Sequence, residues 1–316
     1  MSGEFSAAFE QLVDNLERVI RGKRAVLEQV VICLLAEGHL LIEDVPGVGK
    51  TSIARALAAS IEGSWKRIQF TPDLLPSDVT GITIYNQTEH EFEFHPGGVF
   101  ANIVVADEIN RASPKTQSAL LEVMEERRVT VDSHPHVVPR PFMVIATQNP
   151  IEMDGTYRLP EAQLDRFLMR LAVGYPDARS EREIMNGYHD GAAIDALAAV
   201  LTTARISGMI AAAGEVYVAE ELQDYIVQLT ATTRNTDDVR LGASPRGSLA
   251  LLRAARARAL ADGRNYVLPE DIKELAVTVL AHRIIIEPEA ELRGVSSTDV
   301  ISQVLAAVPV PQVTAA

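Results

Sequence analysis

The chain has 316 residues, enough for about two domains, and its 47% hydrophobic and 23% charged residues are ordinary for a globular protein. Its 43 acidic residues outnumber its 29 basic residues, which leaves a formal net charge of −14 at pH 7. Proteins that bind nucleic acids nonspecifically neutralise phosphates with Lys and Arg, so this balance argues against nucleic acid as the main partner.

Short apolar segments alternate with helical patterns from the N-terminus to about residue 175. The helix that Thr51 opens places Ile53, Leu57 and Ile61 on one face. Short apolar strands that alternate with helices are typical of a parallel sheet covered on both faces, so we predict an α/β core. The predicted strands are 39–43, 66–70, 102–106, 142–146 and 168–173.

Two segments interrupt this alternation. In residues 81–98, two arms of alternating apolar and polar residues flank a polar turn. In residues 128–138, two short arms containing valines flank Asp132-Ser133. Alternation with a period of two residues indicates antiparallel strands, so we predict a small exposed β-hairpin in each segment.

From about residue 175 the pattern changes to Ala-rich helical periodicity. Leu222, Ile226 and Leu229 share one face of a predicted helix, and no strand signal of comparable strength remains. We therefore place a domain boundary at the Pro-Asp turn that follows Tyr175. The prediction is an α/β core over residues 1–175 and an α-helical domain over residues 176–316.

The only cysteine, Cys33, lies in an apolar run, and a buried thiol fits a reducing compartment. The N-terminus shows acidic residues and no basic-then-apolar leader. No segment offers the roughly 20 apolar residues that a membrane-spanning helix needs. We expect a cytoplasmic protein without a membrane segment.

Residues 44–51 read Asp-Val-Pro-Gly-Val-Gly-Lys-Thr, follow a predicted strand and open a helix. This is the setting of a phosphate-binding loop, whose backbone N–H groups and helix N-terminus attract phosphate. We expect Lys50 to reach the β- and γ-phosphates and the Thr51 hydroxyl to ligate Mg²⁺. Glycines allow a close backbone approach that a Cβ would obstruct. The predicted nucleotide-binding residues here are Asp44, Val45, Pro46, Gly47, Val48, Gly49, Lys50, Thr51 and Ser52.

The loop departs from the usual glycine-rich pattern at its first position, which is Asp44. That position must tolerate an unusual turn geometry, and Asp tolerates it better than most residues. Because Gly-Lys-Thr after a strand and before a helix is a specific signal, the prediction of a phosphate-binding loop stands.

The apolar third strand is followed by two carboxylates, Asp107 and Glu108. Asp107 is expected to hold Mg²⁺ through water and to complete the metal site begun by Thr51. Glu108 is expected to orient and polarise the attacking water for in-line phosphoryl transfer. An isolated Asp-Glu pair is often only a solvated strand end, but this pair lies in register with the parallel-sheet pattern.

Three further residues stand where they could act on a nucleotide. Asn149 ends the fourth strand, where open α/β sheets bind ligands, although Asn before Pro is often only a turn residue. Arg166 precedes the fifth strand and is either a surface charge or a contact to a neighbouring subunit's nucleotide. Arg246 lies in the first turn of a helix, where the dipole disfavours a cation, so its placement indicates a function.

These motifs together resemble the AAA+ superfamily and, within it, the MoxR family, over nearly the whole chain. The segments that carry the resemblance are 41–51, 106–112, 146–150 and 159–167. It implies a P-loop core with a five-stranded parallel sheet in a three-layer αβα arrangement, followed by an all-α helical lid. It also implies that the two hairpins are the helix-2 insert and the pre-sensor-1 insert. Other MoxR-like sequences are similar at the position of Asp44.

The same resemblance implies roles for the remaining residues. Asn149 is then sensor 1, Arg166 the arginine finger and Arg246 sensor 2, while Ile20 and Gly22 belong to a segment that packs near adenine. The family implies Mg²⁺-dependent ATP hydrolysis by a hexameric homo-oligomer. It further implies chaperone-like maturation of client proteins, complex assembly or cofactor insertion, often with partners that carry von Willebrand factor A domains.

Two alternatives stay open. A DNA-remodelling or helicase ring could use similar hairpins, but the hairpin tips at 88–91 and 132–134 carry Glu, Asp and His instead of Lys or Arg. That composition favours a protein client. A scaffold that assembles partners and hydrolyses ATP slowly would carry the same motifs. His134 and His136 have no third close ligand, so no zinc site is predicted.

Overall fold

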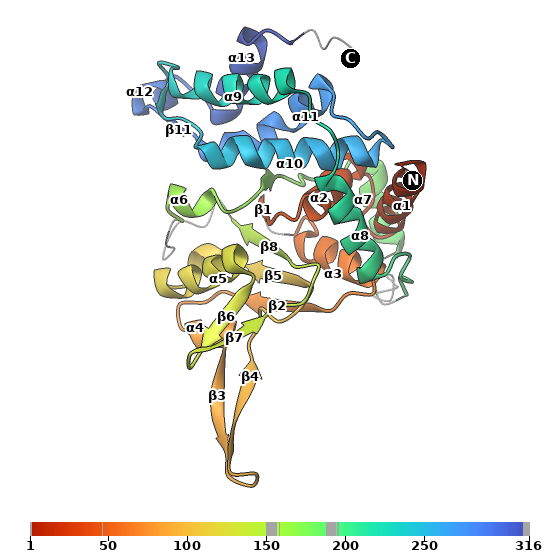
Figure 1. The fold of residues 1–316 in the computed structure, drawn as a ribbon, viewed down its shortest axis with the longest axis vertical. Helices are drawn as coiled ribbons and strands as arrows, with labels where there is room; N and C mark the ends of the chain where they lie inside the picture. Colours follow the sequence, from red (N-terminus) through yellow and green to blue (C-terminus); the bar gives the residue numbers. More distant parts are fainter. Residues whose placement is uncertain are drawn as a thin grey trace.

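The computed structural model of the chain describes residues 2–45, 47–149, 157, 159–187, 194 and 196–311. Its centre is a five-stranded parallel sheet with the strand order β2-β5-β8-β1-β9 (Figure 1). All five predicted core strands are confirmed, with small shifts at their ends. Their bounds are β1 (Leu40–Glu43), β2 (Trp65–Gln69), β5 (Ile103–Asp107), β8 (Met143–Gln148) and β9 (Met169–Leu171).

Helices cover both faces of the sheet. Alternate strand residues point to opposite sides, and since they are apolar on both sides, both faces must be buried. Ile103 and Val105 of β5 belong to one hydrophobic cluster, and Val104 belongs to the other. The first cluster includes residues of α1 (Ser2–Glu17), α2 (Arg24–Leu35) and α3 (Lys50–Ser60). The second includes residues of α4 (Pro76–Thr80) and α5 (Pro114–Glu126). The predicted three-layer αβα core is therefore confirmed.

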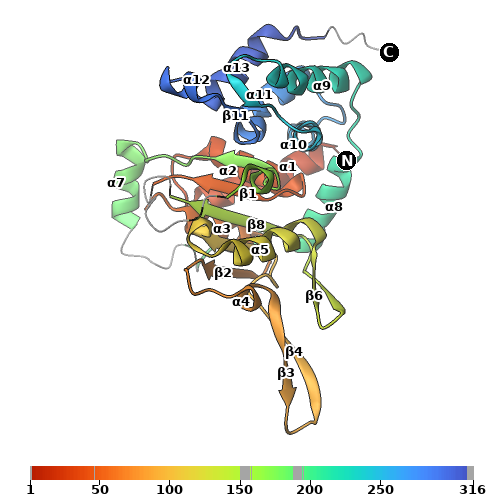
Figure 2. The same ribbon diagram turned by 90° about the vertical axis from the view of Figure 1, so that its left-hand side faces the viewer.

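Both predicted hairpins are present. The first pairs β3 (Gly81–Asn86) with β4 (Glu91–Pro96), and the second pairs β6 (Arg128–Val131) with β7 (His134–Val137). The β3–β4 hairpin projects far from the body of the molecule, at the end opposite the helical lid (Figures 1 and 2).

The C-terminal part is helical, as predicted, with Leu222, Ile226 and Leu229 buried on one face. It also contains a short antiparallel pair, β10 (Val239–Leu241) with β11 (Ile285–Ile286), that the sequence did not reveal. Its helices are α9 (Glu220–Arg234), α10 (Pro245–Ala261), α11 (Pro269–Leu280), α12 (Pro288–Leu292) and α13 (Ser297–Ala307). No helix in the described part of the chain has the length and apolar character needed to cross a membrane.

The remaining described elements are η1 (Ile109–Arg111) and α6 (Glu161–Leu164) in the core, α7 (Ala178–Gly187) and α8 (Thr203–Gly214) between β9 and α9, and η2 (Ala281–Arg283) after α11. Helix α8 contacts both α2 of the core and α10 of the lid. Because α8 packs against both the core and the lid, the domain boundary placed at residue 176 stays a prediction.

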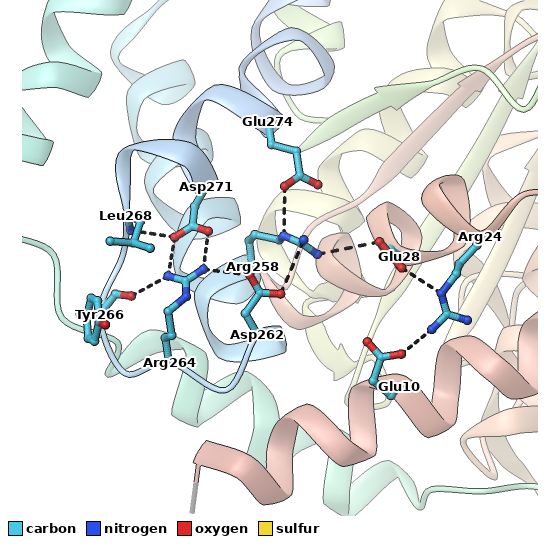
Figure 3. Close-up of polar contacts among 10 residues, drawn as sticks. All are labelled: Glu10, Arg24, Glu28, Arg258, Asp262, Arg264, Tyr266, Leu268, Asp271 and Glu274. Carbon is cyan, nitrogen blue, oxygen red and sulfur yellow. Dashed lines mark hydrogen bonds and ion pairs between the residues drawn. The ribbon is translucent and has the colours of Figure 1, made fainter. Parts of the chain in front are cut away.

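An ion-pair network joins the lid to the first two helices (Figure 3). Arg258 of α10 lies 3.1 Å from Glu274 of α11 and 3.9 Å from Glu28 of α2. Arg24 of α2 pairs in turn with Glu28 and Glu10. Single exposed ion pairs contribute little to stability, but a connected network fixes the relative placement of the helices that it joins.

A second, buried contact holds the lid against the amino ends of the core strands. Arg283 of η2 is 8% exposed and donates to the Asp165 carboxylate at 2.8 Å and to the Phe167 carbonyl at 2.6 Å. Ser244, the N-cap of α10, donates to the other Asp165 oxygen at 2.8 Å. Because a buried charge is costly without partners, these contacts stabilise this docking of the lid on the core.

Candidate active site

Four parallel strands end side by side and bring most of the predicted site residues to one edge of the sheet. Gln69 at the end of β2 pairs with Asp107 at the end of β5. Glu43 at the end of β1 pairs with Gln148 at the end of β8. The phosphate-binding loop follows β1, and Asn149 follows β8. Open α/β sheets bind their ligands at this edge.

The predicted phosphate-binding loop leads directly into α3, as expected. Gly47 and Gly49 have φ angles of +85° and +87°, a region that favours glycine, and Gly49 is the N-cap of the helix. Val48 packs against the core, and Ser52 lies in the first turn of α3. Pro46 lies outside the described residues. The loop thus presents a helix N-terminus of the kind that binds phosphate.

Lys50 donates from Nζ to the Asp44 carbonyl at 2.7 Å. Burial lowers the pKa of the Lys50 ammonium, and the nearby carboxylates of Asp44, Asp107 and Glu108 oppose that shift. The ammonium therefore lies among negative charges at the mouth of the loop, where a nucleotide's phosphates would provide stronger partners.

The Asp44 side chain makes contacts that the sequence did not indicate. Its φ is not among the positive values of the described residues, so a left-handed backbone is not the reason for an Asp at this position. Instead its carboxylate accepts hydrogen bonds from the Val45 amide at 2.8 Å and from the Gly174 amide at 2.6 Å. Asp44 therefore ties the start of the loop to the segment after β9.

The two predicted metal ligands meet. Thr51 Oγ1 donates to Asp107 Oδ2 at 3.2 Å. The Asp107 carboxylate also accepts from Arg67 Nε at 2.7 Å and from Thr147 Oγ1 at 2.9 Å. Among the residues that the structure describes, no group of three or more His, Cys, Asp or Glu could hold a metal ion alone. A hydroxyl beside one carboxylate fits Mg²⁺, which takes few protein ligands and completes its shell with phosphate and water oxygens.

Glu108 is the N-cap of η1 and has a left-handed conformation, with φ of +56° and ψ of +48°. Non-glycine residues adopt this region rarely, and such strain is often found at functional sites. The Glu108 amide donates to Thr147 Oγ1 at 3.0 Å, which fixes the backbone. Its carboxylate accepts from Gln69 Nε2 at 2.8 Å and from Arg111 Nη1 at 3.2 Å. The side chain is therefore held at the strand ends, beside Asp107.

The segment predicted to lie near adenine is connected to the phosphate-binding loop through residues 174 and 175. Ile20 is buried, and Gly22 has a φ of +69° and packs so closely on Ser180 that an added Cβ would lie 2.2 Å from the Ser180 hydroxyl. Lys23 Nζ donates to the Tyr175 carbonyl at 2.7 Å, next to the Gly174 amide that binds Asp44. The adenine contact itself stays a prediction.

Arg166 and Arg246 come together, but at the other end of the sheet. Arg166 Nε donates to Glu125 Oε2 at 3.0 Å, and Arg246 Nη2 donates to Glu125 Oε1 at 2.5 Å. These hydrogen bonds, above all that from Arg166, lower the pKa of Glu125. All three line a pocket of about 270 Å³ with His39, which immediately precedes β1, and Leu168, which immediately precedes β9. The pair therefore lies at the amino ends of the strands, opposite the phosphate-binding loop.

Comparison with known proteins agrees with this architecture. Residues 39–169 match the family described as "ATPase family associated with various cellular activities (AAA)", and residues 231–304 match the AAA lid domain. The chain is 43% identical to "Chaperone MoxR1" of Mycobacterium tuberculosis over 97% of its own length and 83% of that protein. The chain belongs to the MoxR family of AAA+ ATPases.

Two further relatives also match nearly the whole chain. The protein YeaC of Bacillus subtilis is 50% identical over 95% of this chain and 93% of its own. A crystal structure from Cytophaga hutchinsonii superposes with a TM-score of 0.92 at 38% identity, covering 98% of this chain and 97% of the other. Nucleotide binding and ATP hydrolysis follow from membership of this ATPase family.

Three residues of the site escaped the sequence analysis. They are Arg67 and Gln69 on β2, and Thr147 on β8. Arg67 Nη2 donates to Gln69 Oε1 at 2.7 Å, so Gln69 lies in a chain of contacts that runs from Asp107 through Arg67 to Glu108. The available signal was the polar residues at alternate positions of β2, at the end that carries the site in parallel sheets.

Gln69 is expected to position the Glu108 carboxylate of this MoxR-family ATPase. Replacing Gln69 by Leu removes one hydrogen bond to a charged group, a loss of about 1.5 kcal/mol and hence about tenfold in rate. We expect kcat for ATP to fall about tenfold while KM changes little, measured by phosphate release. The control is Gln228→Leu, on an exposed position of α9. A raised KM with an unchanged kcat would contradict the positioning role.

Proposed function

We propose that this MoxR-family ATPase acts as a ring in which each nucleotide lies between two subunits, and that hydrolysis remodels protein clients. The observation that carries the proposal is the shared contact of Arg166 and Arg246 with Glu125. This contact lies beyond the amino end of β1, whereas the phosphate-binding loop follows its carboxyl end. The four residues of β1, at about 3.3 Å each, therefore separate the two by roughly 13 Å. The arginines therefore suit a nucleotide held by another subunit.

Within one subunit, the loop binds the phosphates and the strand ends prepare the water. Lys50 would contact the β- and γ-phosphates, and Thr51 and Asp107 would hold Mg²⁺, which neutralises phosphate charge when bound. Glu108 would orient and polarise the attacking water, and Asn149 would bind the γ-phosphate or that water.

Glu125 would hold the arginines ready for the neighbour's nucleotide. One carboxylate between two guanidinium groups leaves a net positive charge, so the pair still attracts phosphate. A nucleotide's γ-phosphate can displace the carboxylate as the hydrogen-bond partner, because it offers several charged oxygens to each planar fork. Arg166 would then stabilise the charge that develops during transfer.

A protein client fits the surface better than DNA does. The relative named "Chaperone MoxR1" supports a chaperone-like role, and we propose protein maturation, complex assembly or cofactor insertion as the purpose. We further propose a hexamer and, as partners, proteins with von Willebrand factor A domains. The DNA-remodelling alternative would require basic hairpin tips, whereas the β3–β4 hairpin contains no Lys or Arg.

The proposal predicts that activity depends on assembly. We expect ATP turnover per subunit to rise about tenfold or more between dilute and concentrated protein, because an arginine finger contributes about 10³-fold or more to kcat. Phosphate release and sedimentation velocity, measured over the same concentrations with Mg·ATP, test this. Lys50→Ala is the control that should not hydrolyse ATP at any concentration.

Full turnover by a species that sediments as a monomer would contradict the shared site. Slow turnover that does not change on assembly would favour the scaffold alternative. Stimulation by DNA that disappears at high salt would favour the DNA-remodelling alternative.

A further inference from the structure

The β3–β4 hairpin is the most protruding part of the described chain, and its charge is one-sided (Figures 1 and 2). No Lys or Arg occurs between Thr71 and Asn110. The segment from Thr71 to the end of β4 contains five acidic residues, which are Asp73, Asp78, Glu89, Glu91 and Glu93. A partner of this surface must therefore tolerate or require a negative field.

One face of the hairpin is explained by its own stability. Thr83 pairs with Phe94, and Tyr85 pairs with Phe92, whose rings lie 5.1 Å apart. Phe94 in turn stacks on His136 of β7 at 3.7 Å. Cross-strand pairs of this kind stabilise a hairpin by about 0.2–1 kcal/mol each, so these side chains have a structural role although Tyr85 and Phe92 are 46% and 75% exposed.

The opposite face is not explained in this way. Ile82 and Ile84 are 44% and 43% exposed, and their cross-strand neighbours are His95 and Glu93. Neither neighbour offers an apolar side chain to cover the isoleucines, and a threonine would serve an exposed strand equally well. Asn86 and Glu91 continue the same face toward the tip. We call this acidic-apolar surface of Ile82, Ile84, Glu91 and Glu93 the isoleucine face.

We propose that the isoleucine face binds an extended segment of a client protein that alternates apolar and basic side chains. The proposal rests on the client-remodelling function proposed above and names the class of client. Ile82 and Ile84 stand two residues apart, roughly 7 Å, which is also the spacing of same-side residues in an extended peptide. Lys and Arg can pack their aliphatic stems on the isoleucines while their charged ends meet Glu91 and Glu93. The same carboxylates repel DNA and acidic peptides.

Three labelled synthetic peptides of equal length test this by fluorescence anisotropy with the full-length protein. Their residues alternate Lys with Val, Glu with Val, and Lys with Ser. We expect the Lys-Val peptide to bind with a Kd about tenfold or more below those of the other two. Double replacement of Ile82 and Ile84 by Thr should raise that Kd about tenfold, because it removes apolar contact while keeping strand propensity. Double replacement of Glu91 and Glu93 by Gln should remove most of its salt dependence.

The matched control is Val137→Thr on the second hairpin, at a position that is 70% exposed, and it should leave the Kd unchanged. Basal ATP hydrolysis should be unchanged in all of these variants, because none lies at the nucleotide site. If the unaltered protein hydrolyses ATP but binds the three peptides equally, only this inference is contradicted. If the unaltered protein does not hydrolyse ATP, the proposed function is contradicted. The inference is also contradicted if the Glu-Val peptide binds as tightly as the Lys-Val peptide. It is likewise contradicted if the Ile82 and Ile84 replacements dissociate the oligomer but leave the peptide Kd unaffected.

Discussion

Glutamine in place of Glu108 is expected to slow ATP hydrolysis by about 10²- to 10⁴-fold, the range for loss of a positioned acid-base group. The amide has the shape of the carboxylate and can still accept from Gln69 Nε2, so the local structure should persist. It cannot polarise water as an anion does. Lys50 and Thr51 are untouched, so the Kd for ATP should change little. Phosphate release and binding of a fluorescent ATP analogue measure the two effects separately.

The control for this change is Glu126→Gln, an exposed position of α5 that pairs with Arg128. It should leave both turnover and ATP affinity unaltered. Turnover that persists in the Glu108 variant would show that another group activates the water. Loss of ATP binding would show instead that Glu108 maintains the loop.

Alanine in place of Arg166 is expected to reduce turnover by about 10³-fold or more while the altered subunit still binds ATP. Mixing it with Lys50→Ala subunits should restore activity, because those subunits cannot use ATP but still carry Arg166. Each productive site then combines the loop of one variant with the arginine of the other. Arg166→Lys should remain defective, since an ammonium lacks the planar fork that binds two phosphate oxygens.

The mixing experiment needs proof of mixed assembly, which energy transfer between labelled variants provides. Arg293→Ala is the control, because Arg293 is exposed in the lid and pairs with Asp238. It should hydrolyse ATP normally and need no rescue. Mixed assemblies that stay inactive would argue against a site shared between subunits.

The core was predictable because its sheet is buried on both faces, which makes the first four residues of β5 and of β8 continuous apolar runs. The hairpins were predictable from their alternation. The β10–β11 pair was not, because strands of three and two residues are too short to show a period. Site residues that lie in one loop, such as Lys50 and Thr51, were predictable from the sequence spacing of the loop motif alone.

Contacts between distant elements depend on strand order, which the sequence does not state. Gln69 reaches Glu108 only because β2 lies beside β5. Glu125 joins Arg166 to Arg246 across α5, the start of β9 and the lid, and nothing in its local sequence marks it. The contact of Asp44 with Gly174 was missed for the same reason, since the two residues lie far apart along the chain.

The docking of the lid on Asp165 constrains how such a ring can move. Asp165 immediately precedes Arg166, and it binds both Ser244 at the start of α10 and the buried Arg283. Arg166, Arg246 and the lid are therefore linked through Asp165 and Glu125, so a movement of the lid would also move the arginines. If the arginines contact a neighbour's nucleotide, its hydrolysis changes the angle between adjacent subunits more than the angle between lid and core. The β3–β4 hairpin, at the end of the molecule opposite the lid, would then move the farthest.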